Sequence, residues 1–285
     1  MIPRSPDLLS ATHERAKLGY PGAMTSFPRT LITGASSGIG RALALELATQ
    51  GATLHLAGRD ATRLEATALA CRARGADVRT VMLDVRNAAA MATWIEAAGA
   101  LDLVVANAGV SAGSGGNLPE PPAQIRAIMS INVVGMLNTV LPAMAGMAAQ
   151  PRGLDGIAGR IAVIASIAAL VAVPGSAAYC AAKAAVDAWT VATAPGARAQ
   201  GIGLTSICPG YIRTAMTAGN EFPMPGLMDA DRAARIILRA VAAGRVRVAF
   251  PWWMAAAARV ANLLPPRLLA MLAAGRGGKP PDPTL

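Results

Sequence analysis

The chain has 285 residues, of which 54% are hydrophobic and 15% are charged, and its net charge is +10. This composition excludes a disordered protein, because it supplies enough apolar side chains to build a large core. The charge is concentrated late in the chain: residues 235–285 hold eight Lys or Arg against Asp282 alone, whereas residues 1–234 hold 18 basic and 15 acidic side chains. The long first part has no basic stripe interleaved with aromatic residues, so nucleic-acid binding is not expected.

The same survey predicts a cytoplasmic protein without a metal site. Residues 1–23 lack the apolar segment of a signal peptide, and no apolar run reaches the ~18 residues of a membrane span without an Arg, Pro or polar break. The three cysteines, Cys71, Cys180 and Cys208, have neither metal-ligand spacing nor a framework of pairs.

Short β-rich runs alternate with Ala-rich helical segments from Arg29 onward. Residues 41–50 and 63–74 are the clearest helices, and seven strands are expected at residues 30–33, 53–57, 78–83, 101–106, 160–165, 203–208 and 245–250. Such alternation predicts βαβ units and a doubly wound, mainly parallel sheet with helices on both faces. Residues 24–250 would form this domain, residues 1–23 a disordered extension, and residues 251–285 a separate helical tail.

The segment from Leu31 to Gly40, LITGASSGIG, fits two motifs. As G-x-S-x-G it is the nucleophile elbow of a serine hydrolase, with Ser36 as the nucleophile. That interpretation needs a histidine later in the chain, but the two histidines are His13 and His55. The order Ser, acid, His that such an elbow requires cannot be built.

The second interpretation is a dinucleotide-binding turn. Gly34, Gly38 and Gly40 permit a tight turn and close approach of the backbone to a pyrophosphate, which the helix beginning near Ile39 attracts with its positive end. At the end of the second strand, Arg59 stands where a fold that selects NAD tends to place an acid for the ribose hydroxyl. A 2′-phosphate would meet a cation there, so NADP(H) is favoured and NAD(H) is the alternative.

Five further polar residues lie where chemistry is expected. Tyr179 and Lys183 are four residues apart and share one face of a helix, where the ammonium would lower the pKa of the phenol and let it act as an acid or base. Ser166 ends a parallel strand, at the edge where ligands sit in open α/β sheets. Asn107 and Asn132, each taken alone, are a turn residue and a satisfied core amide.

Together these motifs resemble the short-chain dehydrogenase/reductase superfamily over roughly residues 27–250. The matching residues occur in the family's order and spacing: Thr33-Gly-Ala-Ser-Ser-Gly-Ile-Gly40, Asp84, Asn107-Ala-Gly109, Asn132, Ser166, Tyr179-x-x-x-Lys183 and Pro209-Gly-Tyr-Ile-Arg-Thr214. The resemblance implies a single Rossmann-like domain that transfers hydride between NAD(P) and a carbonyl or alcohol. Members are commonly dimers or tetramers, so a homodimer or homotetramer is implied.

The resemblance also implies roles by position. Tyr179 would be the acid/base, and Ser166 would hydrogen-bond the reacting oxygen. Lys183 would hold the nicotinamide ribose and lower the pKa of Tyr179, while Asn132 would hold a water in the proton relay. Cofactor contacts are implied for Tyr179 and Lys183 and for Gly34, Ser36, Ser37, Gly38, Ile39, Gly40, Asp84, Val85, Asn107, Ala108, Gly109, Pro209, Gly210, Ile212 and Thr214.

Three departures from the family pattern stand out. Ala106 replaces the first Asn of the frequent N-N-A-G motif, a mild change. Cys180 follows the implied catalytic Tyr, and a buried, inert thiol is the expectation for it. Pro195 and Gly196 fall inside the helix that starts before Tyr179, so that helix is expected to kink or end early, which puts the family's usual assembly in doubt.

Residues 215–234 are rich in Met, Gly and Pro and lie where the family places its substrate lid. The expected substrate contacts are Ser166, Tyr179, Met216, Phe222, Met224 and Met228. The substrate would then be an apolar carbonyl or alcohol. A surface loop that packs on the core is the alternative for this segment.

In the tail, Trp252 and Trp253 precede Arg259, a Pro pair and the apolar run RLLAML. Adjacent Trp, scattered Arg and short apolar helices suit a membrane interface, so the protein would be peripheral at a membrane. A tail that covers the domain or forms a subunit contact is the more common use of such a surface and is favoured.

An alternative of another class is a non-enzymatic nucleotide-binding or membrane-associated scaffold with the same fold. It predicts the loss of at least one residue of the implied catalytic set. Since Asn132, Ser166, Tyr179 and Lys183 are all present, an enzyme is favoured.

Overall fold

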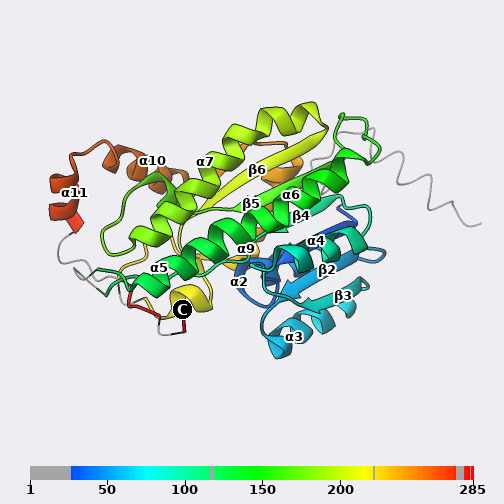
Figure 1. Ribbon diagram of the computed structural model, residues 1–285, viewed down its shortest axis with the longest axis horizontal. Coiled ribbons are helices and arrows are strands. Elements are labelled where there is room, and N and C mark those ends of the chain that lie inside the picture. The colour runs from blue at the N-terminus through cyan, green and yellow to red at the C-terminus, as the bar shows by residue number, and fades with distance from the viewer. Residues whose placement is uncertain (1–26, 116–118, 221, 274–278, 283) are drawn as a thin grey trace, which may run out of the picture.

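The computed structural model describes residues 27–115, 119–220, 222–273, 279–282 and 284–285. The predicted extension, residues 1–23, lies outside these ranges. A seven-stranded parallel sheet forms the centre of the molecule (Figure 1), in the order β3-β2-β1-β4-β5-β6-β9. Its strands are β1 (Arg29–Thr33), β2 (Thr53–Gly58), β3 (Asp77–Met82), β4 (Leu103–Ala106), β5 (Gly159–Ile164), β6 (Ile202–Pro209) and β9 (Arg247–Phe250). The predicted fold class is confirmed.

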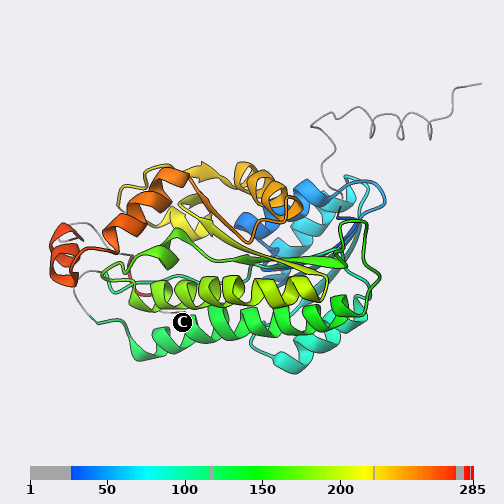
Figure 2. The same ribbon diagram turned by 90° about the horizontal axis from the view of Figure 1, so that it is seen from above.

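Helices cover both faces of this sheet (Figure 2). The helices on one face are α2 (Gly38–Leu47), α3 (Ala61–Arg72) and α9 (Ala230–Ala242), and those on the other are α4 (Ala88–Ala97), α6 (Gly135–Ala148) and α7 (Ala177–Ala199). Alternate strand residues enter the two layers: Ile32 packs with the first set of helices and Leu31 with the second. This is why the strands are apolar at consecutive positions.

The remaining elements lie at the ends of the sheet or along its rim. They are α5 (Pro122–Met129), the π-helical turn η1 (Ser130–Val134), the 3₁₀ turn η2 (Ile167–Leu170), the short parallel pair β7 (Ile212–Arg213) and β8 (Met228–Asp229), α8 (Ala215–Ala218), α10 (Trp252–Ala261) and α11 (Pro266–Ala273). The strand order reverses direction between β1 and β4. In open α/β sheets a crevice forms at the carboxyl ends of the strands at such a point.

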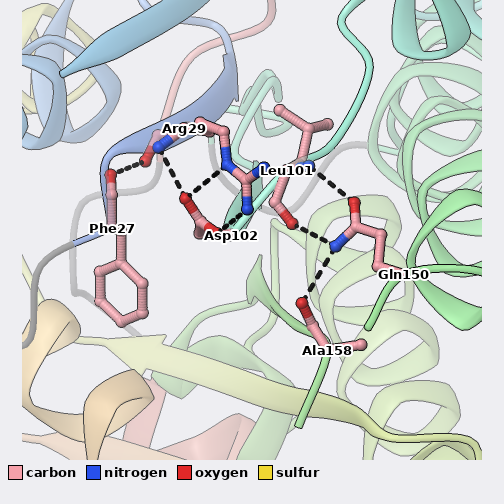
Figure 3. Close-up of polar contacts among 7 residues, drawn as sticks. Phe27, Arg29, Leu101, Asp102, Gln150 and Ala158 are labelled. Atoms are coloured by element: carbon pink, nitrogen blue, oxygen red, sulfur yellow. Dashed lines mark hydrogen bonds and ion pairs between the residues drawn. The ribbon is translucent and has the colours of Figure 1, made fainter. Parts of the chain in front are cut away.

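Polar contacts tie the strands together at the opposite, amino ends (Figure 3). Arg29 binds Asp102 through two guanidinium hydrogen bonds of 3.0 and 2.5 Å, and its backbone N–H donates to the same carboxylate at 2.9 Å. The side chain of Gln150 accepts from the N–H of Leu101 and donates to the carbonyls of Leu101 and Ala158. These hydrogen bonds hold the strands together at the amino edge of the sheet, opposite the edge where a crevice is expected.

The helix α7 does not end at Pro195 and Gly196, so the expectation that it ends early there is wrong. The helix continues through Pro195 and Gly196 to Ala199. Proline removes one backbone hydrogen bond from its helix, but here the loss falls only four residues before the helix end. Ala194 and Ala197 are buried against the sheet on either side of it, and packing of this kind supplies most helical stability in proteins.

The elements α5, η1 and α6 form one continuous helical stretch, Pro122–Ala148, that is long and apolar enough to cross a membrane by length and composition alone. The sequence predicts no such span, because Arg126, Asn132 and Pro142 interrupt the apolar run. In the structure the stretch packs Met136 and Val140 into the core beside the sheet. Core helices of soluble proteins pass the same test.

The tail contacts the domain through α10 and again through its last described residues. Ala255 and Ala258 of α10 pack on Ile167 of η2. Further along, residues 279–282, here called the strap, run beside the loop after β4: the N–H of Gly113 donates to the carbonyl of Pro280 and that of Gly115 to the carbonyl of Lys279. Both contacts lie at the carboxyl edge of the sheet.

Candidate active site

A cavity of about 1310 Å³ occupies the carboxyl edge of the sheet at the point where the strand order reverses. Pockets for one small ligand usually measure about 300–1,000 Å³, so this cavity has room for two molecules side by side. Its wall combines the turn after β1, the ends of β2, β4, β5 and β6, the start of α7, and parts of α8, α10 and the strap.

The glycine turn fits a dinucleotide. Gly34 and Gly38 have φ of +67° and +54°, which side chains other than glycine rarely adopt. Ser37, Gly38 and Ile39 line the cavity where α2 begins, so the positive end of this helix faces a phosphate site. Gly34 and Ser36 also line it.

Gly40 has a different role from the one the sequence implies. It does not line the cavity; a Cβ at this position would lie 2.3 Å from the carbonyl oxygen of Gly34 and 2.6 Å from Nδ2 of Asn107. The third glycine therefore lets α2 pack closely on the turn. Asn107 braces that turn by donating from Nδ2 to the carbonyls of Thr33 and Gly34, at 3.0 and 3.1 Å.

Two arginines line the cavity beyond β2. Arg59, predicted from the sequence, is exposed, and Arg63 comes from the first turn of α3. Asp60 lies between them, but its carboxylate caps α3 by accepting from the N–H of Arg63 at 2.9 Å and also binds Nε of Arg63 at 2.7 Å. The carboxylate of Asp60 is therefore paired with Arg63. Arg59 forms no ion pair within the described residues.

Across from these arginines, Asp84 and Val85 line the cavity, as do Ala108 and Gly109. Asp84 accepts hydrogen bonds from the guanidinium of Arg86, which hold the pKa of its carboxyl below the usual value. At neutral pH Asp84 is therefore an ionised acceptor. The segment after β6 closes the other side with Pro209, Gly210, Ile212 and Thr214.

Tyr179, Ser166 and Lys183 meet in the middle of the cavity. Burial raises the pKa of Tyr179 to about 12, although a hydrogen bond with Ser166 works in the opposite direction. Lys183 donates from Nζ to the carbonyl of Ile164 at 2.7 Å, and burial lowers its pKa to about 8.

The expectation that Lys183 lowers the pKa of Tyr179 is not met in this structure. The ammonium nitrogen lies 5.8 Å from the centre of the Tyr179 ring and is turned to the Ile164 carbonyl. Loss of hydration therefore outweighs any attraction between the two groups, and the phenol stays protonated at neutral pH. Burial also raises the pKa of the neighbouring Cys180 thiol, which keeps it protonated.

A buried polar network holds α7 in place behind these residues. Asp187, one turn after Lys183, accepts a 2.6 Å hydrogen bond from the Ser206 hydroxyl on β6. It also binds the guanidinium of Arg247 on β9 through bonds of 2.9 and 2.7 Å. Because bidentate arginine pairs have a fixed geometry, this network sets the height of α7 above the sheet.

Asn132 lies behind the cavity and does not line it. Its Oδ1 accepts from the N–H of Val110 at 2.8 Å, and its Nδ2 donates to the carbonyl of the same residue at 2.9 Å. It sits in the π-helical turn η1, a feature frequent at functional sites. A Cβ on Gly109 would lie 3.0 Å from Asn132 Oδ1 and 3.6 Å from Lys183 Nζ, so the amide shapes the wall beside Lys183.

The remaining part of the cavity is lined mainly by apolar side chains. Met216 and Phe222 line it as predicted, but Met224 and Met228 do not. Met228 belongs to β8 and packs toward the core under α9, and the sulfur of Met224 accepts from Nδ2 of Asn220. Pro223 and Pro225, on either side of Met224, line the cavity in their place.

Several lining residues escape the sequence motifs. They come from the loop after η2 and from the tail: Val171, Ala172, Val173, Pro174, Met254, Ala257, Ala258, Ala261, Leu269 and Lys279. No motif marks them, because the tail reaches the cavity through contacts with segments distant in sequence, among them η2 and the loop after β4. The basic charge and the short apolar helices of the tail predict that it packs against another surface. They do not predict which surface that is.

This geometry defines a class of protein: a nucleotide-dependent oxidoreductase on a doubly wound sheet. Glycines hold the turn where phosphates bind, and a tyrosine, a serine and a lysine meet beside an apolar chamber. Comparisons with known proteins agree with this class. The family model for short chain dehydrogenase matches residues 29–222.

Relatives resemble most of the chain. An uncharacterized oxidoreductase of Myxococcus xanthus (strain DK1622) is 37% identical over 247 residues, which cover 85% of this chain and 95% of the relative. The probable oxidoreductase EphD of Mycobacterium tuberculosis (strain ATCC 25618 / H37Rv) is 34% identical over 74% of this chain, which spans only 36% of that longer protein. The crystal structure of levodione reductase matches with a TM-score of 0.70 and 26% identity, over 80% of this chain and 97% of that one.

The chain therefore belongs to the short-chain dehydrogenase family. It is an enzyme, an oxidoreductase that acts on CH–OH groups with NAD(P), and the scaffold alternative is set aside.

Proposed function

We propose that this enzyme uses NADP(H) to interconvert a carbonyl and an alcohol on an apolar small molecule, with Tyr179 as the acid/base. The observation that carries the proposal is that one cavity joins the glycine turn, the Tyr179–Ser166–Lys183 group and an apolar wall. The nicotinamide supplies or accepts the hydride when the cofactor is bound. The protein's residues position the reactants and move the proton.

In the direction of reduction, the hydroxyl of Ser166 binds the substrate oxygen, and the phenol of Tyr179 donates a proton to it. The raised pKa of about 12 keeps that proton on Tyr179 at neutral pH, which suits a donor. Lys183 is fixed by the Ile164 carbonyl and would hold the nicotinamide ribose. The side chain of Asn132 is paired with the backbone of Val110, so its proposed part in the proton relay is to hold the chain around Val110 in position.

The preference for NADP(H) is supported by the cations beyond β2. Arg59 and Arg63 both line the cavity, while Asp60 is engaged in the helix cap. Guanidinium groups bind phosphate with strong, directional hydrogen bonds. A 2′-phosphate at this position would find two arginines and no competing free carboxylate on the same loop.

The apolar substrate is supported by the aliphatic, Met and Phe side chains that line the same cavity as Tyr179. A cytoplasmic location is part of the proposal and rests on three free, buried thiols.

A homodimer or homotetramer is also proposed. Exposed Val134 and Leu141, along the long helix beside α7, support an apolar subunit contact.

The test is the variant Tyr179→Phe, assayed with a panel of aldehydes and ketones and with both reduced cofactors. Carbonyl reduction should fall by roughly 10²–10⁴-fold, because a general acid contributes about that much, while NADPH binding measured by fluorescence stays unchanged. Tyr211→Phe removes the other tyrosine hydroxyl of the cavity and should have a much smaller effect. Full activity in Tyr179→Phe would refute the assigned mechanism.

A further inference from the structure

The two helices of the tail have two different faces. Toward the domain, Met254 and Ala261 of α10 and Leu269 of α11 line the active-site cavity. Away from the domain, large apolar side chains remain in solvent: Trp252 is 77% exposed and Leu263 is 84% exposed. Val260 and Met271 are exposed on the same helices, together with Arg259 and Arg267. These six residues, Trp252, Arg259, Val260, Leu263, Arg267 and Met271, are called the tail patch.

The tail patch carries charge of one sign. No Asp or Glu occurs between Asp231 and Asp282, and Arg259 and Arg267 form no ion pair within the described residues. The spacing of Trp252, Arg259, Val260 and Leu263 places them on one side of α10 and the turn after it, since a helix repeats every 3.6 residues. The patch is therefore both apolar and cationic.

The tail patch lies at one end of the molecule, where α10 and α11 extend beyond the sheet (Figures 1 and 2). At 10 and 8 residues the two helices are too short to span a bilayer. They have the length and composition of helices that lie flat in the interface, where Trp is enriched and Arg meets anionic headgroups.

A second copy of the chain is a poorer occupant than a bilayer. In a two-fold dimer the same patch is used on both subunits, so Arg259 and Arg267 would approach their own equivalents with no carboxylate nearby to offset them. An anionic lipid surface complements this charge and also accepts the indole and aliphatic side chains.

A second, apolar pocket adjoins the active-site cavity at this end of the molecule. It measures about 560 Å³ and lies between the loop after η2, the start of α7, and Asn262 and Leu269 of the tail. Val171, Val173, Cys180 and Leu269 line both this pocket and the active-site cavity. The two cavities therefore adjoin, and the residues that they share include Cys180, the neighbour of Tyr179.

We propose that the tail patch docks on the surface of an anionic bilayer and that the enzyme takes its substrate, a lipophilic carbonyl or alcohol, from that bilayer through the adjoining pocket. The docking stands on the exposed residues alone. The delivery of substrate rests on the function proposed above.

Docking is tested by flotation of the purified full-length enzyme with phosphatidylcholine vesicles, with and without phosphatidylglycerol. The enzyme should float with the anionic vesicles and only weakly with neutral ones. Two variants, Arg259→Glu with Arg267→Glu, and Trp252→Ser with Leu263→Ser and Met271→Ser, should bind at least about tenfold more weakly. Leu154→Ser is the matched control, because Leu154 is fully exposed in the loop before β5 and away from the tail; it should float like the wild type.

Two results would overturn the docking: no flotation of the wild type, or equal flotation of the patch variants. A wild-type dimer in light scattering that the serine variant abolishes, without any flotation, would assign the patch to a subunit contact instead. All the exchanged side chains are exposed, so circular dichroism and thermal unfolding should match the wild type.

Delivery is tested separately, by NADPH oxidation with a short water-soluble ketone and with a long-chain ketone embedded in anionic vesicles. The patch variants should keep the rate on the soluble ketone and lose most of the rate on the embedded one. Equal rates on the embedded ketone would overturn delivery. Flotation without reduction of any carbonyl by the wild type would leave docking in place and reject the proposed function.

Discussion

For Lys183 and Tyr179, burial has a larger effect on the pKa than neighbouring charge has. The pattern Tyr-x-x-x-Lys predicts that the two side chains share a helix face, and they do. It also predicts a lowered pKa for the phenol, and this is wrong in the structure, where the pKa is raised to about 12. A local spacing can place two groups together, but the loss of water around them depends on residues from the whole cleft.

The buried ammonium of Lys183 makes a prediction about stability. Its pKa is about 8 in the folded protein, against an ordinary value of 10.5 for a solvated lysine, so between these values the unfolded chain binds more protons and stability rises with pH. Burial of the protonated Lys183 lowers the free energy of unfolding by up to about 3 kcal/mol. This loss is complete below pH 8 and absent above pH 10.5. Urea unfolding gives the free energy of unfolding of the cofactor-free wild type and of Lys183→Met. As the pH rises from 8 to 10.5, the value of the wild type should increase relative to that of the variant. A difference independent of pH would contradict the account.

Arg59 carries the predicted choice of cofactor. In Arg59→Glu a carboxylate would face the 2′-phosphate, and kcat/KM with NADPH should fall by about 10–100-fold, because a hydrogen bond to a charged group contributes about 1.5–3 kcal/mol. The value with NADH should stay the same or rise. The matched control is Arg79→Glu, an exposed arginine on β3 outside the cavity. If kcat/KM fell equally with both cofactors, or if the wild type preferred NADH, Arg59 would not select NADPH.

Among the elements, the strands and the clearest helices were predictable. All seven strands occur where the sequence places them, because each is a short apolar run. The predicted helices at 41–50 and 63–74 are observed at Gly38–Leu47 and Ala61–Arg72. The start of α2 agrees with the helix start predicted near Ile39, directly after the glycine turn. Helix α3 begins two residues before the predicted segment because the carboxylate of Asp60 caps it.

The strap is an element that no motif predicts. Its Lys279 donates from Nζ to the carbonyl of Met216 in α8 at 2.9 Å, and its backbone pairs with Gly113 and Gly115. The N–H of Asp282 donates to the side chain of Gln124 in α5 at 3.0 Å. The strap thus ties the segment around Met216, where the sequence predicts a substrate lid, to the loop after β4.

Removal of residues 279–285 should therefore loosen this predicted lid. KM for the carbonyl substrate should rise by about tenfold, as expected for the loss of a few backbone hydrogen bonds of about 0.5–1.5 kcal/mol each, while kcat changes less. Hydrogen exchange should accelerate at residues 113–115 and 215–218. Lys279→Met keeps the backbone pairing and should give a smaller effect. Unchanged KM together with unchanged exchange would show that the strap does not restrain the lid.

At the scale of the whole molecule, the position of the cleft follows from topology. Chain order reverses between β1 and β4, and all parallel strands end at the same edge, so Gly34, Asn107, Ser166 and Pro209 converge although they are far apart in sequence. This convergence could be expected from the alternation of strands and helices. The tail could not be placed in this way, because its helices follow the last strand and no repeating rule governs where they pack.

The sequence by itself therefore determined the doubly wound sheet, the glycine turn and the identity of Tyr179, Ser166 and Lys183, because these depend on local apolar patterns and on short motifs at strand ends. Only the tertiary structure decided that Gly40 serves packing, that Met224 and Met228 stay out of the cavity, and that α10, Leu269 and Lys279 enter it. The physical reason is that a side chain's direction and hydration depend on contacts between segments distant in sequence, which no local pattern contains.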